Sequence, residues 1–333
     1  MNGQEHVIDN SDTAAQSLFG KGNQHLNYLR KRGLDGVFLK TNDHWMELFF
    51  PVELGVTAIN KISVFDLDRG PRTKRVHELQ NVYPKVRDDG DILLSDKEKL
   101  SMSFNLEPPG PDLRAMKVRS DELQLELVAT MPGTYESHYW VQPLSDEKQH
   151  YFQTWKTAAI PLHEFSYGYG GKEFRCGKNE CLLTTDQYRT HPDYGMAFWF
   201  FTASTVTADG RTVGIVLTDG IGSGYTGQDR ASEDHVNLGG KVHKLDQSLA
   251  EFDADNLMNP VRLNTAGGER RFANSCSLIY SPAFKDKDGV NLFLLAFVRD
   301  VTYGRATGHC VIDGEQVQIE GAYGFFETVY TRY

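Results

Sequence analysis

Residues 186–245 combine the ionisable side chains that acid–base chemistry on a small molecule would require. Asp186 and Arg189 are three positions apart in a polar segment, where a carboxylate can transfer a proton and a guanidinium can hold a carbonyl or carboxylate. His243 lies on an expected strand further along, and an imidazole titrates near neutral pH. This segment therefore predicts a proton-transfer site, with Asp186, Arg189, His191 and His243 as candidate catalytic residues.

Glu327 is a fifth catalytic candidate, and it lies in a strand that is otherwise apolar and aromatic. Either alternation places its carboxylate on the solvent face, or the carboxylate is buried with a raised pKa and is functional. Asp186 and Arg189 could likewise form a structural ion pair. Asp219 could bind a ligand, or its carboxylate could bond the backbone of its own turn. The sequence leaves these alternatives open.

Aromatic side chains near these groups could wall a ligand pocket, although aromatic residues also serve core packing. The predicted substrate-binding residues are Trp155, Tyr188, Tyr194, Trp199 and Asp219.

We predict neither a metal nor a cofactor. Cys176 and Cys181 are spaced poorly for zinc, and the expectation is a pair of reduced thiols on neighbouring strands. The glycine-rich segments 168–171 and 220–224 do not follow the strand–GxGxxG–helix layout of nucleotide-binding folds.

The composition is that of a globular protein, with 333 residues, 40% hydrophobic and 24% charged, and a net charge of −10. Because phosphate binding needs clustered positive charge and no basic run occurs, nucleic acid and anionic membrane surfaces are unexpected partners. The longest apolar runs are far shorter than the roughly 20 residues of a membrane helix. The first residues do not have the pattern of a signal peptide. The expectation is a cytoplasmic protein with a small-molecule partner.

Strands must position these residues, because apolar and polar side chains alternate with period two along much of the chain. Leu100, Met102 and Phe104 show this pattern. About seven or eight strands are expected before residue 160 and a similar number after it, and Asp313-Gly314 is a hairpin signal. The predicted class is all-β, with two lipocalin-like antiparallel barrels and few short helices. The predicted divisions are a flexible arm (1–25), an N-terminal β domain (26–160) and a C-terminal barrel (161–333).

Several blocks, in order, resemble the uncharacterised family called domain of unknown function 2804. They are Val64-Phe65-Asp66-Leu67, FQTWKTAAIP at 152–161, residues 186–204, Thr218-Asp219-Gly220, residues 241–245, Asp253-Ala254-Asp255 and Gly324-Phe325-Phe326-Glu327. The resemblance covers about residues 30–333 and rests on the order of the blocks. That family looks similar in architecture to the carotenoid hydratase and fungal Diels–Alderase group. The resemblance implies two lipocalin-like barrels around a pocket, and water addition or cyclisation on polyene-like substrates.

Three functions follow as hypotheses. The first is an enzyme without redox cofactor, a hydratase, isomerase or cyclase, acting on a largely apolar substrate in a barrel pocket by acid–base chemistry and shape control. The second is a carrier of a lipophilic ligand with the same pocket and no turnover. The third is a carbohydrate-active hydrolase or lyase, for which Asp186, Asp219 and Glu327 would have to converge as paired carboxylates.

Overall fold

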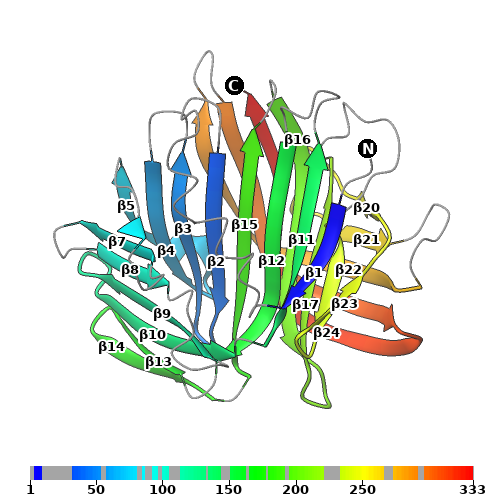
Figure 1. The fold of residues 1–333 in the computed structure, drawn as a ribbon, viewed down its shortest axis with the longest axis horizontal. Helices are drawn as coiled ribbons and strands as arrows, with labels where there is room; N and C mark the ends of the chain where they lie inside the picture. Colours follow the sequence, from blue (N-terminus) through cyan, green and yellow to red (C-terminus); the bar gives the residue numbers. More distant parts are fainter. Residues whose placement is uncertain are drawn as a thin grey trace. The chain divides into compact units, whose positions relative to one another are not determined.

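A computed structural model of the chain describes residues 4–9, 32–53, 58–80, 85–86, 92–96, 100–104, 113–132, 134–143, 151–162, 165–177, 179–191, 195–220, 233–265, 273–291 and 296–332. Within these residues the chain forms strands and one short 3-10 helix, η2 (Gly70–Thr73) (Figure 1). The predicted all-β class is confirmed. No helix in the described ranges is both long and apolar enough to cross a membrane.

Contacts along the chain define two compact units, each assembled from separate stretches of sequence. Unit 1 comprises Met1–Val7, His138–Ala159 and Thr190–Tyr333, and unit 2 comprises Ile8–Ser137 and Ile160–Arg189. Apart from β1 (Gln4–Asp9), the predicted arm (1–25) lies outside the described residues. Whether the chain divides into folding domains at residue 160 stays a prediction.

Unit 2 is built from antiparallel strands over an apolar core. Its strands are β2 (Arg32–Lys40), β3 (His44–Glu53), β4 (Ala58–Asp66), β5 (Arg75–Gln80), β6 (Lys85–Val86), β7 (Ile92–Asp96), β8 (Leu100–Phe104), β9 (Leu113–Ser120), β10 (Leu125–Pro132), β13 (Phe165–Tyr169) and β14 (Lys172–Cys176), with most of β15 (Cys181–His191). One sheet has the order β14-β13-β10-β9-β8-β7-β6. Along β10, Leu125, Leu127 and Ala129 are buried in the core while Glu126 and Val128 are exposed, as alternation predicts.

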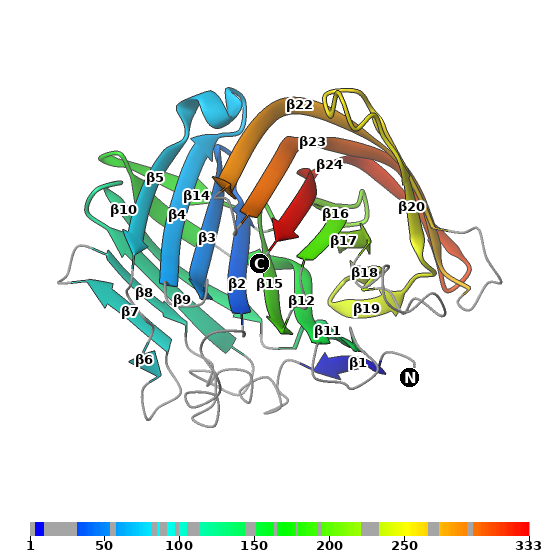
Figure 2. The ribbon, with the colours of Figure 1, turned by 90° about the horizontal axis from the view of Figure 1, so that it is seen from above.

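Unit 1 contains a nine-stranded sheet with the order β19-β18-β17-β16-β24-β23-β22-β21-β20. Its strands are β16 (Gly195–Val206), β17 (Thr212–Asp219), β18 (His235–Leu238), β19 (Lys241–Lys244), β20 (Ser248–Glu251), β21 (Val261–Thr265), β22 (Ser275–Asn291), β23 (Ala296–Ile312) and β24 (Glu315–Arg332). Figure 2 shows the long strands β22, β23 and β24 arching, so that the sheet curls. Phe201, Ile215, Tyr280 and Phe326 pack on one face as its core. The antiparallel, curled sheet is of the lipocalin-like kind that the sequence predicts.

The other face of this sheet is covered where β17 lies, because β17 is buried along nearly its whole length instead of alternating. Parts of two further strands belong to unit 1 here, β11 (Glu136–Pro143) from His138 onward and β12 (Tyr151–Leu162) as far as Ala159. Ala158 of β12 lies so close to Gly214 of β17 that a Cβ at Gly214 would stand 2.4 Å from the Ala158 Cβ. The two layers therefore come together at two small residues.

The strands β11 and β12 pair with one another. The two strands are antiparallel, and His138 lies directly opposite Lys156 in their register. Both side chains therefore share one face of the pair.

The cysteines form two disulfides, Cys176–Cys181 and Cys276–Cys310. The expectation that Cys176 and Cys181 are reduced thiols is therefore wrong. The two residues come within bonding reach because they lie on either side of the short turn between β14 and β15.

Candidate active site

The candidate site lies on the covered face of the curled sheet in unit 1, and the strand register defines which residues share that face. His235 pairs with Val216 on the neighbouring strand. Val216 in turn pairs with Thr202, and Thr202 with Phe325. Paired residues in antiparallel strands lie on the same face, so these four residues form a row across β18, β17, β16 and β24. The core residue Phe201 points the opposite way.

Lys156 of β12 extends from the covering strand onto this face. Its Nζ lies 2.8 Å from Oε2 of Glu233, so the two side chains form a salt bridge. Nζ also lies 3.9 Å from the centroid of the Phe200 ring, in cation–π geometry. Lys156 and Glu233 are both buried, at 4% and 0% relative exposure. Charged residues are almost never this buried unless they are paired.

Two histidines lie beside this ion pair. The ring centroids of His138 and His235 are 4.9 Å apart, and both residues are fully buried. Nδ1 of His235 lies 2.7 Å from the carbonyl oxygen of Glu233. Because a carbonyl only accepts, Nδ1 carries the proton and Nε2 is left with its lone pair. Among the described residues, neither Nε2 of His235 nor either ring nitrogen of His138 has a hydrogen-bond partner.

Burial lowers the pKa of both imidazoles. The pKa of His235 falls to about 3, mainly through desolvation; its hydrogen bond to Glu233 opposes the shift, and the charges of Lys244 and Lys156 add to it. The pKa of His138 is held well below its usual value, first by desolvation and then by Lys244, His235 and Lys156. Both rings are therefore neutral at physiological pH, and a neutral imidazole is a proton acceptor.

Asp234 holds its two neighbours in the sequence, Glu233 and His235, in position at the site. Its Oδ1 accepts from the Thr218 backbone N–H at 2.7 Å and from the Ser248 hydroxyl at 2.9 Å. Its Oδ2 accepts from the Ser248 backbone N–H at 2.8 Å. These bonds tie the start of β18 to β17 and β20, and so hold Glu233 and His235 in place on the opposite face.

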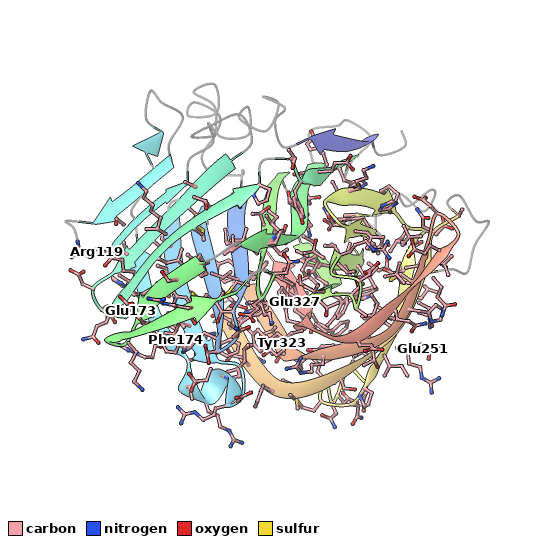
Figure 3. The ribbon with its side chains drawn as sticks, turned by 90° about the horizontal axis from the view of Figure 1, so that it is seen from below. Arg119, Glu173, Phe174, Glu251, Tyr323 and Glu327 are labelled. Atoms are coloured by element: carbon pink, nitrogen blue, oxygen red, sulfur yellow. A yellow bond between two sulfur atoms is a disulfide. The ribbon has the colours of Figure 1, made fainter. Side chains whose placement is uncertain are left out.

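A second buried ion pair, Arg299–Glu327, lies on the same face. Glu327 is the register partner of Phe200 across β16 and β24. The Arg299 guanidinium lies 5.3 Å from the Phe325 ring centroid, and the Phe325 and Phe200 rings are 5.7 Å apart. In Figure 3, Glu327 lies within the layer of side chains, whereas Glu251 points outward at the rim of the sheet. The carboxylate of Glu327 is therefore buried and paired with Arg299, and its functional role stays a prediction.

The chain matches the family described as "Domain of unknown function (DUF2804)" over residues 15–333. It belongs to this family. A comparison with curated proteins gave no match.

Among solved structures, kievitone hydratase from Nectria haematococca is similar to this DUF2804 protein, with 11% identity over 93% of this chain and 92% of that chain and a TM-score of 0.47. CghA is similar with 12% identity over 90% and 88% and a TM-score of 0.43. Likeness at this level carries no argument about activity, so the site must be judged on its own geometry.

In addition to Glu327, the structure describes the side chains of four predicted site residues. Trp199 is buried in the core, where it stacks on Phe326. Oδ1 of Asp219 accepts from the Gly220 backbone N–H at 2.8 Å and from Gln247 Nε2 at 3.0 Å. His243 lies on β19 with Nδ1 3.2 Å from Oδ2 of Asp313. Asp186 is half-buried on β15, in unit 2.

The side chains of the other predicted residues lie outside the described part of the chain, and their roles stay predictions. These residues are Trp155, Tyr188, Arg189, His191 and Tyr194. The described residues contain no group of three or more His, Cys, Asp or Glu side chains arranged to hold a metal ion.

His138, Glu233 and His235 were not predicted from the sequence to be functional, and Lys156 stood out only as part of a block of family resemblance. One signal was present. His138 and His235 stand next to buried strand residues, where a titratable group is unusual. What brings them together is the placement of β11 and β12 on β17 and β18, and no local pattern encodes that placement.

Proposed function

We propose that this protein is a small-molecule enzyme that works by proton transfer without a redox cofactor, as a hydratase, isomerase or cyclase. The observation that carries the proposal is the Nε2 lone pair of His235, which has no partner among the described residues and is buried beside a second neutral imidazole and the Lys156–Glu233 ion pair. A neutral, positioned imidazole can act as a general base; with a pKa of about 3 in the folded protein, His235 would act as one only where charge developing on the substrate beside it raises that pKa.

Each of these groups has a role in the proposed reaction. Nε2 of His235 takes a proton from a substrate carbon or hydroxyl adjacent to a conjugated system. The resulting imidazolium keeps its Nδ1–H bond to the Glu233 carbonyl. The ammonium of Lys156 stabilises the negative charge that develops on the substrate oxygen. The His235 imidazolium then returns that proton to the substrate at the new position, which leaves His235 neutral again beside His138, whose ring is 4.9 Å away.

The residues predicted from the sequence form a competing assignment of the same chemistry, in which Asp186 and His243 transfer the proton and Arg189 orients the substrate. The apolar, polyene-like substrate expected from the sequence belongs to this proposal as well. The carbohydrate-active alternative has less support. Glu327 contacts Arg299 and Asp219 bonds its own turn, so these carboxylates are not arranged as a facing pair.

The test is turnover of a panel of conjugated enones and hydroxyketones in D₂O, followed by mass spectrometry. Deuterium incorporation, a gain of one water or an isomeric product marks activity. We expect His235→Gln to reduce the rate by about 10²–10⁴-fold. His309→Gln, which changes a histidine on β23 away from the site, is the matched control and should keep the rate.

Two outcomes would reject this assignment. If His235→Gln keeps full activity while Asp186→Asn or His243→Gln loses it, the chemistry belongs to the residues predicted from the sequence. If compounds bind but none is converted by the unmodified protein, the protein is a carrier.

A further inference from the structure

We infer that this site binds an uncharged ring compound through a hydroxyl group, as in a phenol, an enol or an alcohol, and discriminates against carboxylates and phosphates. The inference rests on the proposed site and deepens the proposed function by naming a substrate class.

The first argument is charge balance. Each buried cation on the covered face already contacts a carboxylate, Lys156 with Glu233 and Arg299 with Glu327. An anionic ligand would therefore add a net negative charge to a region with almost no solvent exposure, and buried uncompensated charge is strongly unfavourable. Lys244 is a third cation nearby and the register partner of His235; its charge lowers the pKa of both histidines, but because it is half-buried, solvent weakens what it could offer to an anion.

The second argument is the kind of hydrogen-bonding atom that the site offers. Nε2 of His235, both ring nitrogens of His138 and Oγ1 of Thr154 are buried and have no partner among the described residues. Thr154 lies two residues before Lys156 on β12, and so shares its face. These groups are neutral, and Oε1 of Glu233, another buried oxygen of the site without a hydrogen-bond partner among the described residues, belongs to a carboxylate that would repel an anion. A buried polar group without a partner costs about 1–3 kcal/mol, so a native site normally provides one.

The third argument is the direction of the bond. Because Nδ1 of His235 already donates to Glu233, Nε2 can only accept while the ring is neutral. Its partner must be a donor, and a ligand hydroxyl is a donor whereas a carboxylate, a phosphate or an ether oxygen is not. Phe200 and Trp140 supply aromatic surface for the body of the ligand, since Phe200 lies against Lys156 and Trp140 is the buried register partner of Thr154.

Calorimetric titration of the full chain at pH 7 with three matched probes tests the inference. The probes are 4-hydroxyacetophenone, 4-methoxyacetophenone, which lacks the donor, and 4-hydroxybenzoate, which adds a charge. We expect the hydroxyketone to bind at least about tenfold more tightly than either of the others, the effect of one hydrogen bond. His235→Phe should abolish its advantage over the methoxy compound, and His309→Gln should preserve it.

Equal or tighter binding of the benzoate overturns the inference, as does equal binding of the two ketones or no measurable binding of all three. If His235→Phe does not fold, His235→Gln takes its place, and the comparison of probes on the unmodified protein still decides. The outcome is separable from that of the proposed function. Selective binding of the hydroxyketone without turnover of any substrate rejects the enzyme alone, and turnover of carboxylate substrates rejects the ligand class alone.

Discussion

Nζ of Lys156, on the covering strand β12, lies 2.8 Å from Oε2 of Glu233, at the entry to β18 of the curled sheet. This ion pair joins two layers of unit 1 at a point where neither partner is more than 4% exposed. A buried ion pair adds little net stability over apolar packing, whereas removal of one partner is strongly destabilising. Its retention beside two neutral histidines fits a functional role better than a purely structural one.

Lys156→Met should therefore lower the free energy of unfolding by about 3–5 kcal/mol, because it leaves the Glu233 carboxylate buried without its counter-ion. The double variant Lys156→Met/Glu233→Gln should recover most of that loss. Chemical denaturation of the unmodified protein, Lys156→Met, Glu233→Gln and the double variant measures both effects. Lys241→Met on exposed β19 is the control and should change stability by less than about 0.5 kcal/mol. Additive losses in the double variant would show that the two side chains do not interact.

Gly214→Ala should destabilise the protein by about 1–3 kcal/mol, because the added methyl group would overlap Ala158 on the covering strand. Gly168 offers a matched control within a strand, since a Cβ there would meet nothing closer than 3.9 Å. Thermal unfolding should show a lowered midpoint for Gly214→Ala and little change for Gly168→Ala. Equal midpoints for the two variants would mean that β12 does not lie on β17 as described.

Stability should fall as the pH is lowered below about 6.5. Burial depresses the pKa of His138 and His235 in the folded protein, whereas both titrate near 6.5 when unfolded. Below that pH the unfolded chain therefore binds more protons; His235 alone costs about 2 kcal/mol of stability by pH 5, and His138 adds to the loss in the same direction. The loss continues toward the folded pKa of His235, about 3. Chemical denaturation at several pH values gives the free energy of unfolding as a function of pH. This free energy should fall less steeply with falling pH for His138→Gln/His235→Gln than for the unmodified protein. The same slope for both proteins would refute the prediction.

Glu327→Gln should destabilise the protein more than Glu251→Gln, although each removes a carboxylate facing an arginine. The side chains of Arg299 and Glu327 are 7% and 12% exposed, whereas those of Arg262 and Glu251 are 70% and 71% exposed. We expect a loss of about 3 kcal/mol or more for Glu327→Gln and less than about 1 kcal/mol for Glu251→Gln. Comparable losses, measured by urea denaturation, would argue that Glu327 is solvated.

Local patterns were sufficient to predict the all-β class but not the number of strands: seven or eight were expected before residue 160, whereas β1 to β12 begin there in the described residues. Alternation correctly indicated which side chains of β10 are buried, since that strand has one wet face. The Asp313-Gly314 hairpin is confirmed, because Ile312 pairs with Glu315 and both turn residues have positive φ.

The packing of strands that are distant in the sequence was not predictable in the same way. Both faces of β17 are buried because β12 lies on one of them. The same contact explains why position 214 requires glycine. The site residues were the hardest feature to predict. Most of the candidates from the sequence cluster locally in residues 186–245, whereas the buried site includes His138 and Lys156 from the earlier strand pair β11 and β12.

The account depends most on His235 being neutral with its proton on Nδ1, and nitrogen-15 NMR of the histidine side chains measures this directly. With the resonance assigned through His235→Gln, we predict the shifts of the neutral Nδ1–H tautomer, unchanged from pH 7.5 to pH 5, and a perturbed Nε2 shift when 4-hydroxyacetophenone binds. A ring that titrates near pH 6.5, or that carries its proton on Nε2, would contradict the account.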